Sequence, residues 1–268
     1  MKFSLRGRCG LVWLAIASAL ASANLSAHEA DGTLRFGTSL GYPPFEYRGA
    51  GGQIEGFEID LGNAICAHLH KRCEWVETEI STMVPAINGR KFDAVLASLE
   101  VTEARQKQML FTDKVYVGSS RMIARAGSAL RPDPASLAGK HVGVELGSIE
   151  ETFAKQRWAP RGVDVVSYND PETAYSDLMN GRLDSILTTE VQGQLGFLGT
   201  ARGKGFAFAG GPLRDLALGS GVSAIGVARG NAALAGQLNS ALAALHADGT
   251  YQRIAAKYFP PSIDIYGR

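Results

Sequence analysis

Residues 141–168 read HVGVELGSIEETFAKQRWAPRGVDVVSY and carry the pattern that decides the fold. The apolar runs at 141–145 and 163–168 predict two strands, and Gly147-Ser148 precedes a helix that we expect over 150–158. A strand, a helix and a second strand in this order predict a parallel βαβ unit. The stretch therefore indicates an α/β protein.

The same alternation of strands and helices extends on both sides of this unit. Thr102 is a predicted helix cap, Asp170-Pro171 is a predicted helix start, and Gly249 is a predicted helix end. The chain thus contains two cycles of βα units. The predicted strands are 34–38, 74–77, 93–98 and 183–188, and the predicted helices are 58–70, 83–88, one beginning at 103, 171–180 and 234–245.

Two long apolar runs, 115–124 and 217–228, suit strands that cross between two lobes. The predicted fold class is therefore α/β with two lobes, each a mostly parallel sheet flanked by helices, and with a two-strand hinge. We expect 28–117 and 218–268 to form a large lobe and 118–217 to form a small lobe.

The start of the chain has the character of a secretory signal peptide. Basic residues precede an apolar run at 11–21 that is too short for a stable membrane anchor, and small residues follow it. We expect residues 1–27 to be removed, with cleavage after Ala23 or Ala27. The mature chain is therefore expected to be exported.

Removal of that segment leaves two cysteines, Cys66 and Cys73. An even number of cysteines in an exported chain predicts one disulfide, and two free buried thiols are the alternative. The bridge would close a small loop and stabilise the fold by about 2–3 kcal/mol. Without a matching histidine pattern, two cysteines predict no metal site.

The composition argues against several classes of function. The 268 residues have a net charge of +1, and no basic run is interleaved with aromatic residues. Nucleic acid and membrane surfaces are therefore not expected partners. No trio of nucleophile, base and orienting group is apparent, so we expect neither an enzyme nor a cofactor.

Candidate binding residues follow the predicted strands at their carboxyl ends, where ligands of open α/β sheets bind. Tyr42 lies on a stiff Pro-Pro turn, from which its ring can lie against a ligand. Arg105 is in the first turn of a helix, where a cation opposes the helix dipole, so we expect its guanidinium to bind a carboxylate. A surface pair with Glu103 is the alternative. Gly147 precedes a helix start that exposes backbone N–H groups to an anion.

Short segments spread over nearly all of the mature chain resemble the periplasmic solute-binding proteins of amino-acid uptake systems, in particular the subgroup for lysine, arginine, ornithine and histidine. The segments are GT at 37–38, YPPFE at 42–46, GFEIDL at 56–61, VTEARQ at 101–106, FTD at 111–113, GKHVGV at 139–144, WAPRG at 158–162, YSDL at 175–178, ADGTY at 247–251 and KYF at 257–259. The resemblance implies the periplasmic binding protein (Venus flytrap) fold. It also implies a monomer in the periplasm that closes around an amino acid and delivers it to an inner-membrane ABC permease. Cys66 and Cys73 fall where this subgroup carries its disulfide.

The resemblance also implies roles for individual residues. Arg105 would hold the ligand's α-carboxylate, together with backbone N–H groups near Ser148 and Ile149. Ser98 would bind the α-amino group. The expected walls for the ligand side chain are Tyr42 and Ile80, and the expected hinge segments are 117–119 and 219–222.

This chain departs from the family where the ligand ammonium binds. Glu100 stands where the family usually has a small hydroxyl residue, and Thr189 stands where it usually has an aspartate. We expect Glu100 to bind the ammonium with help from Thr189, because a buried ammonium needs a charged partner. In the competing interpretation, Glu100 points to solvent and Glu190 replaces the aspartate.

Further departures point to a cationic ligand. Glu145 stands at a position that is often apolar, and Ser39 stands where close relatives often carry an aspartate. With Arg105 positive and Glu100 and Glu145 negative, the predicted site has a net charge of −1, which arginine, lysine or ornithine neutralises. Histidine stays open. Ala97 and Ser39 leave room for an opine, which is one alternative; a periplasmic cyclohexadienyl dehydratase on the same fold is another.

Overall fold

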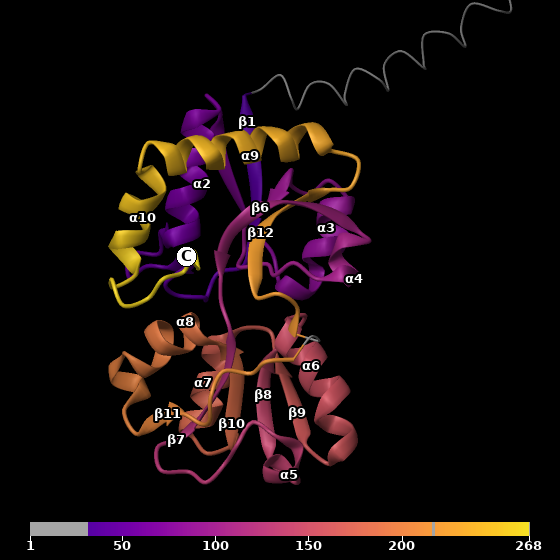
Figure 1. The fold of residues 1–268 in the computed structure, drawn as a ribbon, viewed down its shortest axis with the longest axis vertical. Coiled ribbons are helices and arrows are strands. Elements are labelled where there is room, and N and C mark those ends of the chain that lie inside the picture. The colour runs from indigo at the N-terminus through magenta and orange to yellow at the C-terminus, as the bar shows by residue number, and fades with distance from the viewer. Residues whose placement is uncertain (1–31, 216–217, 268) are drawn as a thin grey trace, which may run out of the picture.

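Each lobe of the molecule is built on its own sheet, as Figure 1 shows, and each of these two sheets has five strands. The computed structural model describes residues 32–215 and 218–267, and the predicted signal peptide lies outside them. We call residues 32–117 and 222–267 the large lobe and residues 120–215 the small lobe. The architecture is the two-lobed α/β fold predicted from the alternation of elements.

The large-lobe sheet has the strand order β4-β1-β5-β12-β6. Its strands are β1 (Thr33–Thr38), β4 (Arg72–Glu77), β5 (Ala94–Val95), β6 (Met109–Val117) and β12 (Val222–Ala228), and β2 (Tyr47–Arg48) and β3 (Ile54–Glu55) form a separate hairpin. β1 pairs in parallel with β4 and β5, and β12 is the strand that runs against the other four. The sheet is thus mostly parallel, as predicted.

Helices cover both faces of this sheet. Apolar side chains of α2 (Phe57–His68), α9 (Ala232–Ala247) and α10 (Thr250–Tyr258) pack against one face, and those of α3 (Met83–Asn88) pack against the other. A 3-10 turn, η1 (Ile80–Thr82), precedes α3. The helix α10 was not predicted, because Gly249 was interpreted only as an end. With a φ of 75° it ends α9 and is also the N-cap position of α10.

The small-lobe sheet has the strand order β11-β7-β10-β8-β9. Here β7 is the strand that runs against the other four, so this sheet is also mostly parallel. Helices α6 and α7 supply buried side chains to two separate apolar clusters. The strands are β7 (Ser120–Arg125), β8 (His141–Glu145), β9 (Asp164–Tyr168), β10 (Ser185–Thr189) and β11 (Phe206–Phe208), and the helices are α5 (Pro134–Leu137), α6 (Ile149–Arg157), α7 (Pro171–Met179) and α8 (Glu190–Gln192), with the short turns η2 (Ala159–Arg161), η3 (Gly193–Leu198) and η4 (Ala201–Gly203).

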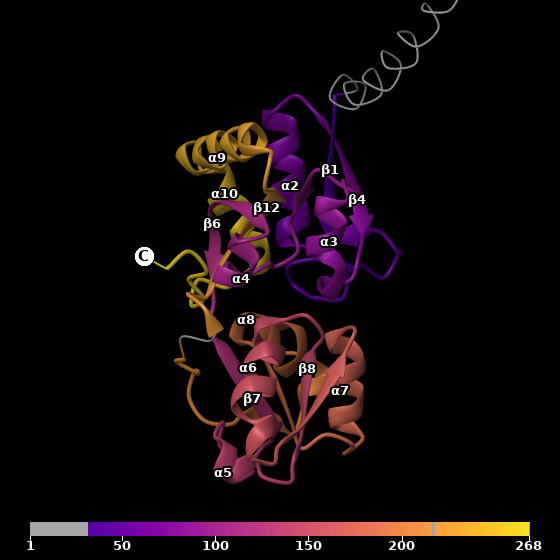
Figure 2. The same cartoon turned by 90° about the vertical axis from the view of Figure 1, so that its right-hand side faces the viewer.

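The two lobes are joined by chain segments that lie side by side. Figure 2 shows both segments at one side of the space between the lobes. The backbone N–H of Gly118 donates to the carbonyl of Gly221 over 2.8 Å. A Cβ at Gly221 would lie 2.1 Å from the Gly118 carbonyl oxygen, so only glycine permits this approach. The apolar run predicted at 115–124 is therefore two strands, β6 and β7, divided at this crossing.

The strand β5, which leads to Ser98, is shorter than predicted. The strand predicted over 93–98 forms ladder pairs only at Ala94–Val95. Ser98 then takes a left-handed φ of 50°, and its side chain is bonded to a buried carboxyl group. Backbone pairing resumes beyond it, where Glu100 forms an isolated bridge with Ser223 of β12. The apolar pattern could not indicate this interruption.

The predicted disulfide is present. Cys66 near the end of α2 and Cys73 near the start of β4 are bonded, with a Cα–Cα distance of 5.7 Å. Because α2 lies on the sheet face and β4 is an edge strand, the bond ties the helix to the sheet at the amino ends of the strands.

Candidate functional site

A small cavity lies between the two lobes. Both lobes line it at the carboxyl ends of their strands, which is where the strand-end rule places a ligand. Its lining consists of Ser39, Tyr42, Glu46, Ile80, Ala97, Ser98, Leu99 and Glu100 from the large lobe and Glu145, Ser148 and Glu150 from the small lobe. The cavity is therefore lined by one aromatic and several aliphatic side chains together with four carboxyl groups.

The lobes are in contact around this cavity. The hydroxyl groups of Tyr42 and Thr189 share a hydrogen bond of 2.7 Å across the gap. The Arg105 guanidinium reaches from the large lobe to donate to the Gly147 carbonyl over 2.9 Å. A Cβ on Gly147 would lie 2.6 Å from the Cα of Ser81 in the other lobe. The structure is thus a closed form in which a glycine permits backbone contact between the lobes.

Arg105 is held at the junction of the lobes. Thr102 caps its short helix, α4 (Glu103–Gln106), by accepting from the Arg105 backbone N–H over 3.2 Å. The guanidinium is buried, and its Nη1 donates to the Glu100 carbonyl over 2.7 Å and approaches the Glu100 carboxylate at 3.3 Å. The predicted alternative, a surface pair with Glu103, is wrong, because the partners of this side chain are Glu100 and Gly147.

Two carboxyl groups of the large lobe flank Ser98, and one of them, Glu46, lines the cavity itself. Ser98 donates its backbone N–H to Glu58 over 2.8 Å and its hydroxyl to Glu46 over 3.1 Å. Burial raises the pKa of Glu58 to about 7. Burial, and then the neighbouring Glu58 charge, raises the pKa of Glu46 well above its ordinary value. The two carboxyl groups also hydrogen bond to each other.

Two carboxyl groups of the small lobe also line the cavity. Glu145 ends β8, and within the described residues its carboxyl group forms no hydrogen bond or ion pair. Glu150 lies in the first turn of α6 and accepts from the Ser120 hydroxyl over 2.7 Å. Burial, followed by the Glu100 charge, raises the pKa of Glu150 to about 7 and that of Glu145 well above its ordinary value. A bound cation would favour the ionised forms of both groups.

The predicted site residues are brought together in most cases. Thr189 meets Tyr42 across the gap, and Ile149 and Thr189 line a neighbouring cavity. Glu190 ion-pairs with Arg121 at 3.0 Å and is absent from the lining of the interlobe cavity. The predicted residues that line the interlobe cavity are Ser39, Tyr42, Ile80, Ala97, Ser98, Glu100, Glu145 and Ser148.

Three lining residues were not predicted: Glu46, Leu99 and Glu150. Glu150 was overlooked because an acidic residue in the first turn of a helix already suits the helix dipole. Its position directly after the predicted anion-binding turn was the available signal, since a carboxylate there competes with an anionic ligand. Glu46 was quoted only as part of the aromatic turn.

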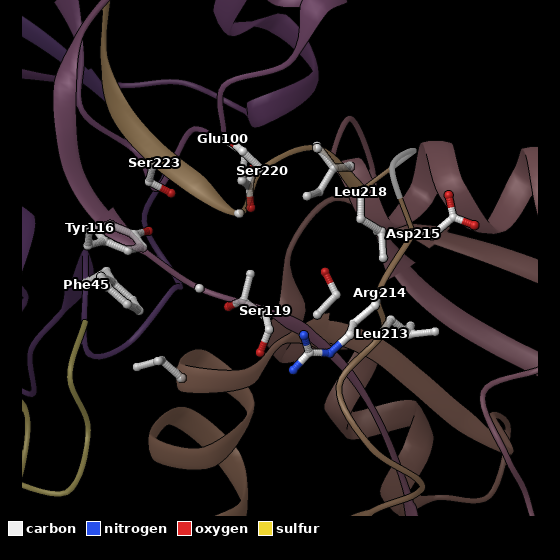
Figure 3. Close-up of a pocket in the computed structure, with 17 residues that line it drawn as sticks. Phe45, Glu100, Tyr116, Ser119, Leu213, Arg214, Asp215, Leu218, Ser220 and Ser223 are labelled. Carbon is white, nitrogen blue, oxygen red and sulfur yellow. The ribbon is translucent and has the colours of Figure 1, made fainter. Parts of the chain in front are cut away.

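A second cavity lies beside the hinge and is shown in Figure 3. Glu100 lines both cavities and thus stands between them. The rings of Phe45 and Tyr116 stack at 4.6 Å on the large-lobe side. In Figure 3 the Arg214 side chain extends toward Ser119, on the opposite side of the opening from these rings. The hinge cavity therefore extends the space available next to Glu100.

The described part of the chain lacks both a metal-binding cluster and a membrane-spanning helix. In residues 32–215 and 218–267, no three His, Cys, Asp or Glu side chains are grouped in a way that could hold a metal ion. No helix in the described part of the chain combines the length and apolar character needed to cross a membrane.

Comparisons with known proteins agree with the geometry. Residues 34–261 match the model of the bacterial extracellular solute-binding proteins, family 3. The chain is 42% identical to the lysine/arginine/ornithine-binding periplasmic protein of Escherichia coli (strain K12), over 88% of this chain and 90% of that protein. It is 41% identical to the L-arginine-binding protein of Pseudomonas aeruginosa, over 94% and 96% of the two chains. A solved ancestral arginine-binding protein bound to arginine superposes with a TM-score of 0.79 at 31% identity, covering 85% of this chain and 99% of that one.

Proposed function

The chain belongs to the bacterial extracellular solute-binding proteins, family 3, and from this premise we propose that it is the substrate-binding component of an ABC importer for cationic amino acids. The ligands are arginine, lysine or ornithine, with histidine as a further candidate, since relatives are named for these amino acids. The chain acts as a binding protein and not as an enzyme. It works in the periplasm after removal of residues 1–27.

The observation that carries this proposal is the charge of the interlobe cavity. Glu100, Glu145 and Glu150 all line it, and Arg105 at its edge is the basic group that contacts one of them. A neutral or acidic amino acid would leave these carboxylates buried without a counter-charge, which costs several kcal/mol. A cationic side chain supplies the missing charge, while Tyr42 supplies an aromatic wall for its aliphatic part.

The positions of the residues support individual roles in this proposal. For an amino-acid ligand, Arg105 and the backbone N–H groups at Ser148 and Ile149 bind the α-carboxylate, and Ser98 binds the α-amino group. Glu145 meets the side-chain cation. This last role is supported by the absence of any hydrogen bond to Glu145 from the described residues.

Closure of the lobes retains the ligand. Residues 28–117 and 218–268 move as the large lobe and 118–217 as the small lobe, with the hinge at 117–119 and 219–222. Ligand contacts from both lobes shift the population to the closed form. The paired segments at Gly118 and Gly221 support this hinge. The closed monomer then docks on the inner-membrane permease.

Calorimetry on refolded, ligand-stripped protein tests the proposal. The ligands are arginine, lysine, ornithine, histidine, glutamine, glutamate and an opine. We expect the cationic ligands to bind tightest and glutamate weakest. The proposal is wrong if glutamine or glutamate binds more tightly than every cationic ligand, or if no ligand binds at all.

A further inference from the structure

The acid that follows Thr189 is bonded to the segment that connects the lobes. The backbone N–H of Glu190 donates to the Ser119 carbonyl over 2.7 Å, and the Ser119 hydroxyl donates to the Glu190 carboxylate over 2.5 Å. Arg121 Nη1 donates to the same carboxylate over 3.0 Å. Glu190, at the start of α8, is thus held by residues that directly follow the crossing at Gly118.

Arg121, the basic partner in this group, is itself held in place. Its Nη2 donates to the Gly210 carbonyl over 2.8 Å, and its guanidinium lies over the Phe208 ring, 4.0 Å from the ring centroid. The Arg121 and Glu190 side chains are 20% and 36% exposed. An ion pair with this exposure contributes little to stability by itself. We therefore look for its effect in the position of the segment that it holds.

The segment that begins at Thr189 contacts the large lobe at the Tyr42-Pro43 turn. Thr189 is the N-cap residue of α8, but its hydroxyl does not cap that helix and instead shares the 2.7 Å hydrogen bond with the Tyr42 hydroxyl. A Cβ at Gly196 would lie 2.7 Å from the Pro43 carbonyl oxygen. Residues 189–196 therefore approach the turn closely from the small lobe, and we call them the closing segment.

Apolar side chains of the closing segment add to this contact. Val191 is a buried member of the large-lobe cluster that contains Phe45 and Tyr116, and Leu195 packs against the same cluster. The closing segment thus belongs to the small lobe by its bonds to Ser119 and to the large-lobe core by its packing. Its position relative to the connecting segment determines whether both sets of contacts form together.

We propose that Glu190 is a positioning residue for ligand binding, which holds the closing segment so that the Thr189 hydroxyl meets Tyr42 when the lobes close. The proposal rests on the proposed function, since it concerns closure over the ligand of the interlobe cavity. Glu190 does not line that cavity, so it acts through Thr189 and not through its charge on the ligand. Its loss should therefore weaken cationic and neutral ligands by the same factor.

The variant Glu190→Ala tests this role on ligand-stripped protein. We expect arginine affinity to fall about tenfold, mainly through faster dissociation, because the closed form would no longer hold the hydrogen bond between Thr189 and Tyr42. Glutamine affinity should fall by the same factor. Glu190→Gln retains an oxygen acceptor for Ser119 and should recover most of the affinity.

Glu172→Ala is the matched control for a lost ion pair. Glu172 pairs with Arg202 in the same lobe, is 38% exposed and lines neither cavity. The control should bind arginine like wild type. An unchanged arginine affinity in folded Glu190→Ala, or an equal loss in Glu172→Ala, overturns the proposal. If wild type itself binds no amino acid, the proposed function fails and this proposal with it, whereas normal binding by both wild type and Glu190→Ala defeats the positioning role alone.

A double-variant cycle separates positioning from a general loss of structure. Tyr42→Phe keeps the ring and removes the hydroxyl that bonds to Thr189. In this background Glu190→Ala should lower arginine affinity by no more than about twofold, because the contact that it positions is already absent. A tenfold loss in both backgrounds would refute the role. If circular dichroism shows that Glu190→Ala does not fold, Ser119→Ala replaces it in the cycle, with an expected loss of about threefold in wild type and none in Tyr42→Phe.

Discussion

The two lobes present carboxyl groups to the cavity in different ways. In the large lobe, Glu46 and Glu58 are fully enclosed and are bonded to Ser98 and to each other. In the small lobe, Glu145 has no bonded partner within the described residues, although it lines the cavity. Glu46 and Glu58 thus have partners in the protein, whereas Glu145 has none among the described residues and is left for a ligand. The proposed selectivity for a cation therefore depends on Glu145 of the small lobe together with Glu100 of the large lobe.

Replacing Gly147 tests whether closure by the small lobe is needed at all. In Gly147→Ala the new Cβ would lie 2.6 Å from the Cα and 2.8 Å from the backbone nitrogen of Ser81, so the lobes could not close fully. We expect arginine affinity, measured by calorimetry, to fall about 100-fold, because contacts from one lobe would be lost.

Gly162→Ala is a close control for that variant. Gly147 and Gly162 have φ values of 84° and 85°, and a Cβ at Gly162 meets nothing within 4 Å. Both substitutions introduce the same backbone strain, but only one obstructs closure. Gly162→Ala should lose a little thermal stability and keep its affinity. Equal affinities of the two variants would show that the contact at Ser81 does not limit closure.

Replacing Glu145 tests whether the small lobe selects the ligand charge. Glu145→Gln keeps the shape and removes the carboxylate that has no partner among the described residues. We expect arginine affinity to fall about tenfold and glutamine affinity to rise or stay constant, because the uncompensated charge is gone. Glu79→Gln, an exposed acid near the cavity, should change neither value. An unchanged ratio of arginine to glutamine affinity in Glu145→Gln would contradict the assignment.

Much of this contrast could be predicted from the sequence, and part of it could not. Tyr42, Ser98 and Glu145 were predicted because parallel strands bring their carboxyl ends to one edge, and all three line the cavity. Glu150 was not, because a first-turn acid is also favourable without a ligand. The Glu100–Arg105 pair was not predicted either, because it depends on side-chain torsions that residue spacing does not determine.

The fold was predictable to a similar degree. The parallel strands and capped helices followed from local patterns, as at Asp170, whose side chain accepts from the backbone N–H of Thr173. The boundary between β6 and β7 could not be predicted from the local pattern, because the apolar run continues through it. That break is set by contact between Gly118 and Gly221, which lie far apart in the sequence.

The raised carboxyl pKa values predict a pH dependence of ligand binding. Glu150 has a pKa of about 7 in the ligand-free protein, and a bound cation favours its ionised form. Below that pKa a proton must leave before the cation gains a full counter-charge. We expect arginine affinity to rise severalfold between about pH 5.5 and pH 8, with glutamine affinity nearly constant. Glu150→Gln should reduce the pH dependence, and a wild-type affinity that is flat over this range would exclude the mechanism.

The stability of the ligand-free protein should change in the opposite direction. Glu58 and Glu150 have an ordinary pKa of 4.5 and a folded-state pKa of about 7. Between these two pH values the folded state therefore binds more protons than the unfolded state. Stability from these groups is therefore present at low pH and is lost as the pH rises from about 4.5 to about 7. The midpoint of thermal unfolding, followed for wild type and Glu150→Gln, should show a smaller decline in the variant. A decline of the same size in both would remove Glu150 as a cause.

Removing the disulfide should have the smallest effect on binding. Cys66–Cys73 joins α2 to the start of β4, where Cys73 pairs with Leu34 of β1, whereas the cavity lies beyond the opposite ends of these strands. We expect the double variant Cys66→Ser, Cys73→Ser to lose about 2–3 kcal/mol of stability in denaturant unfolding, because the unfolded chain gains freedom. Its arginine affinity should stay within about twofold of wild type, because the folded large lobe presents the same cavity residues with or without the disulfide. Treatment of wild type with a reductant should reproduce both results. A large loss of affinity in a folded variant would contradict this expectation. It would mean that the large lobe is not ordered without the disulfide and that ligand binding has to order it.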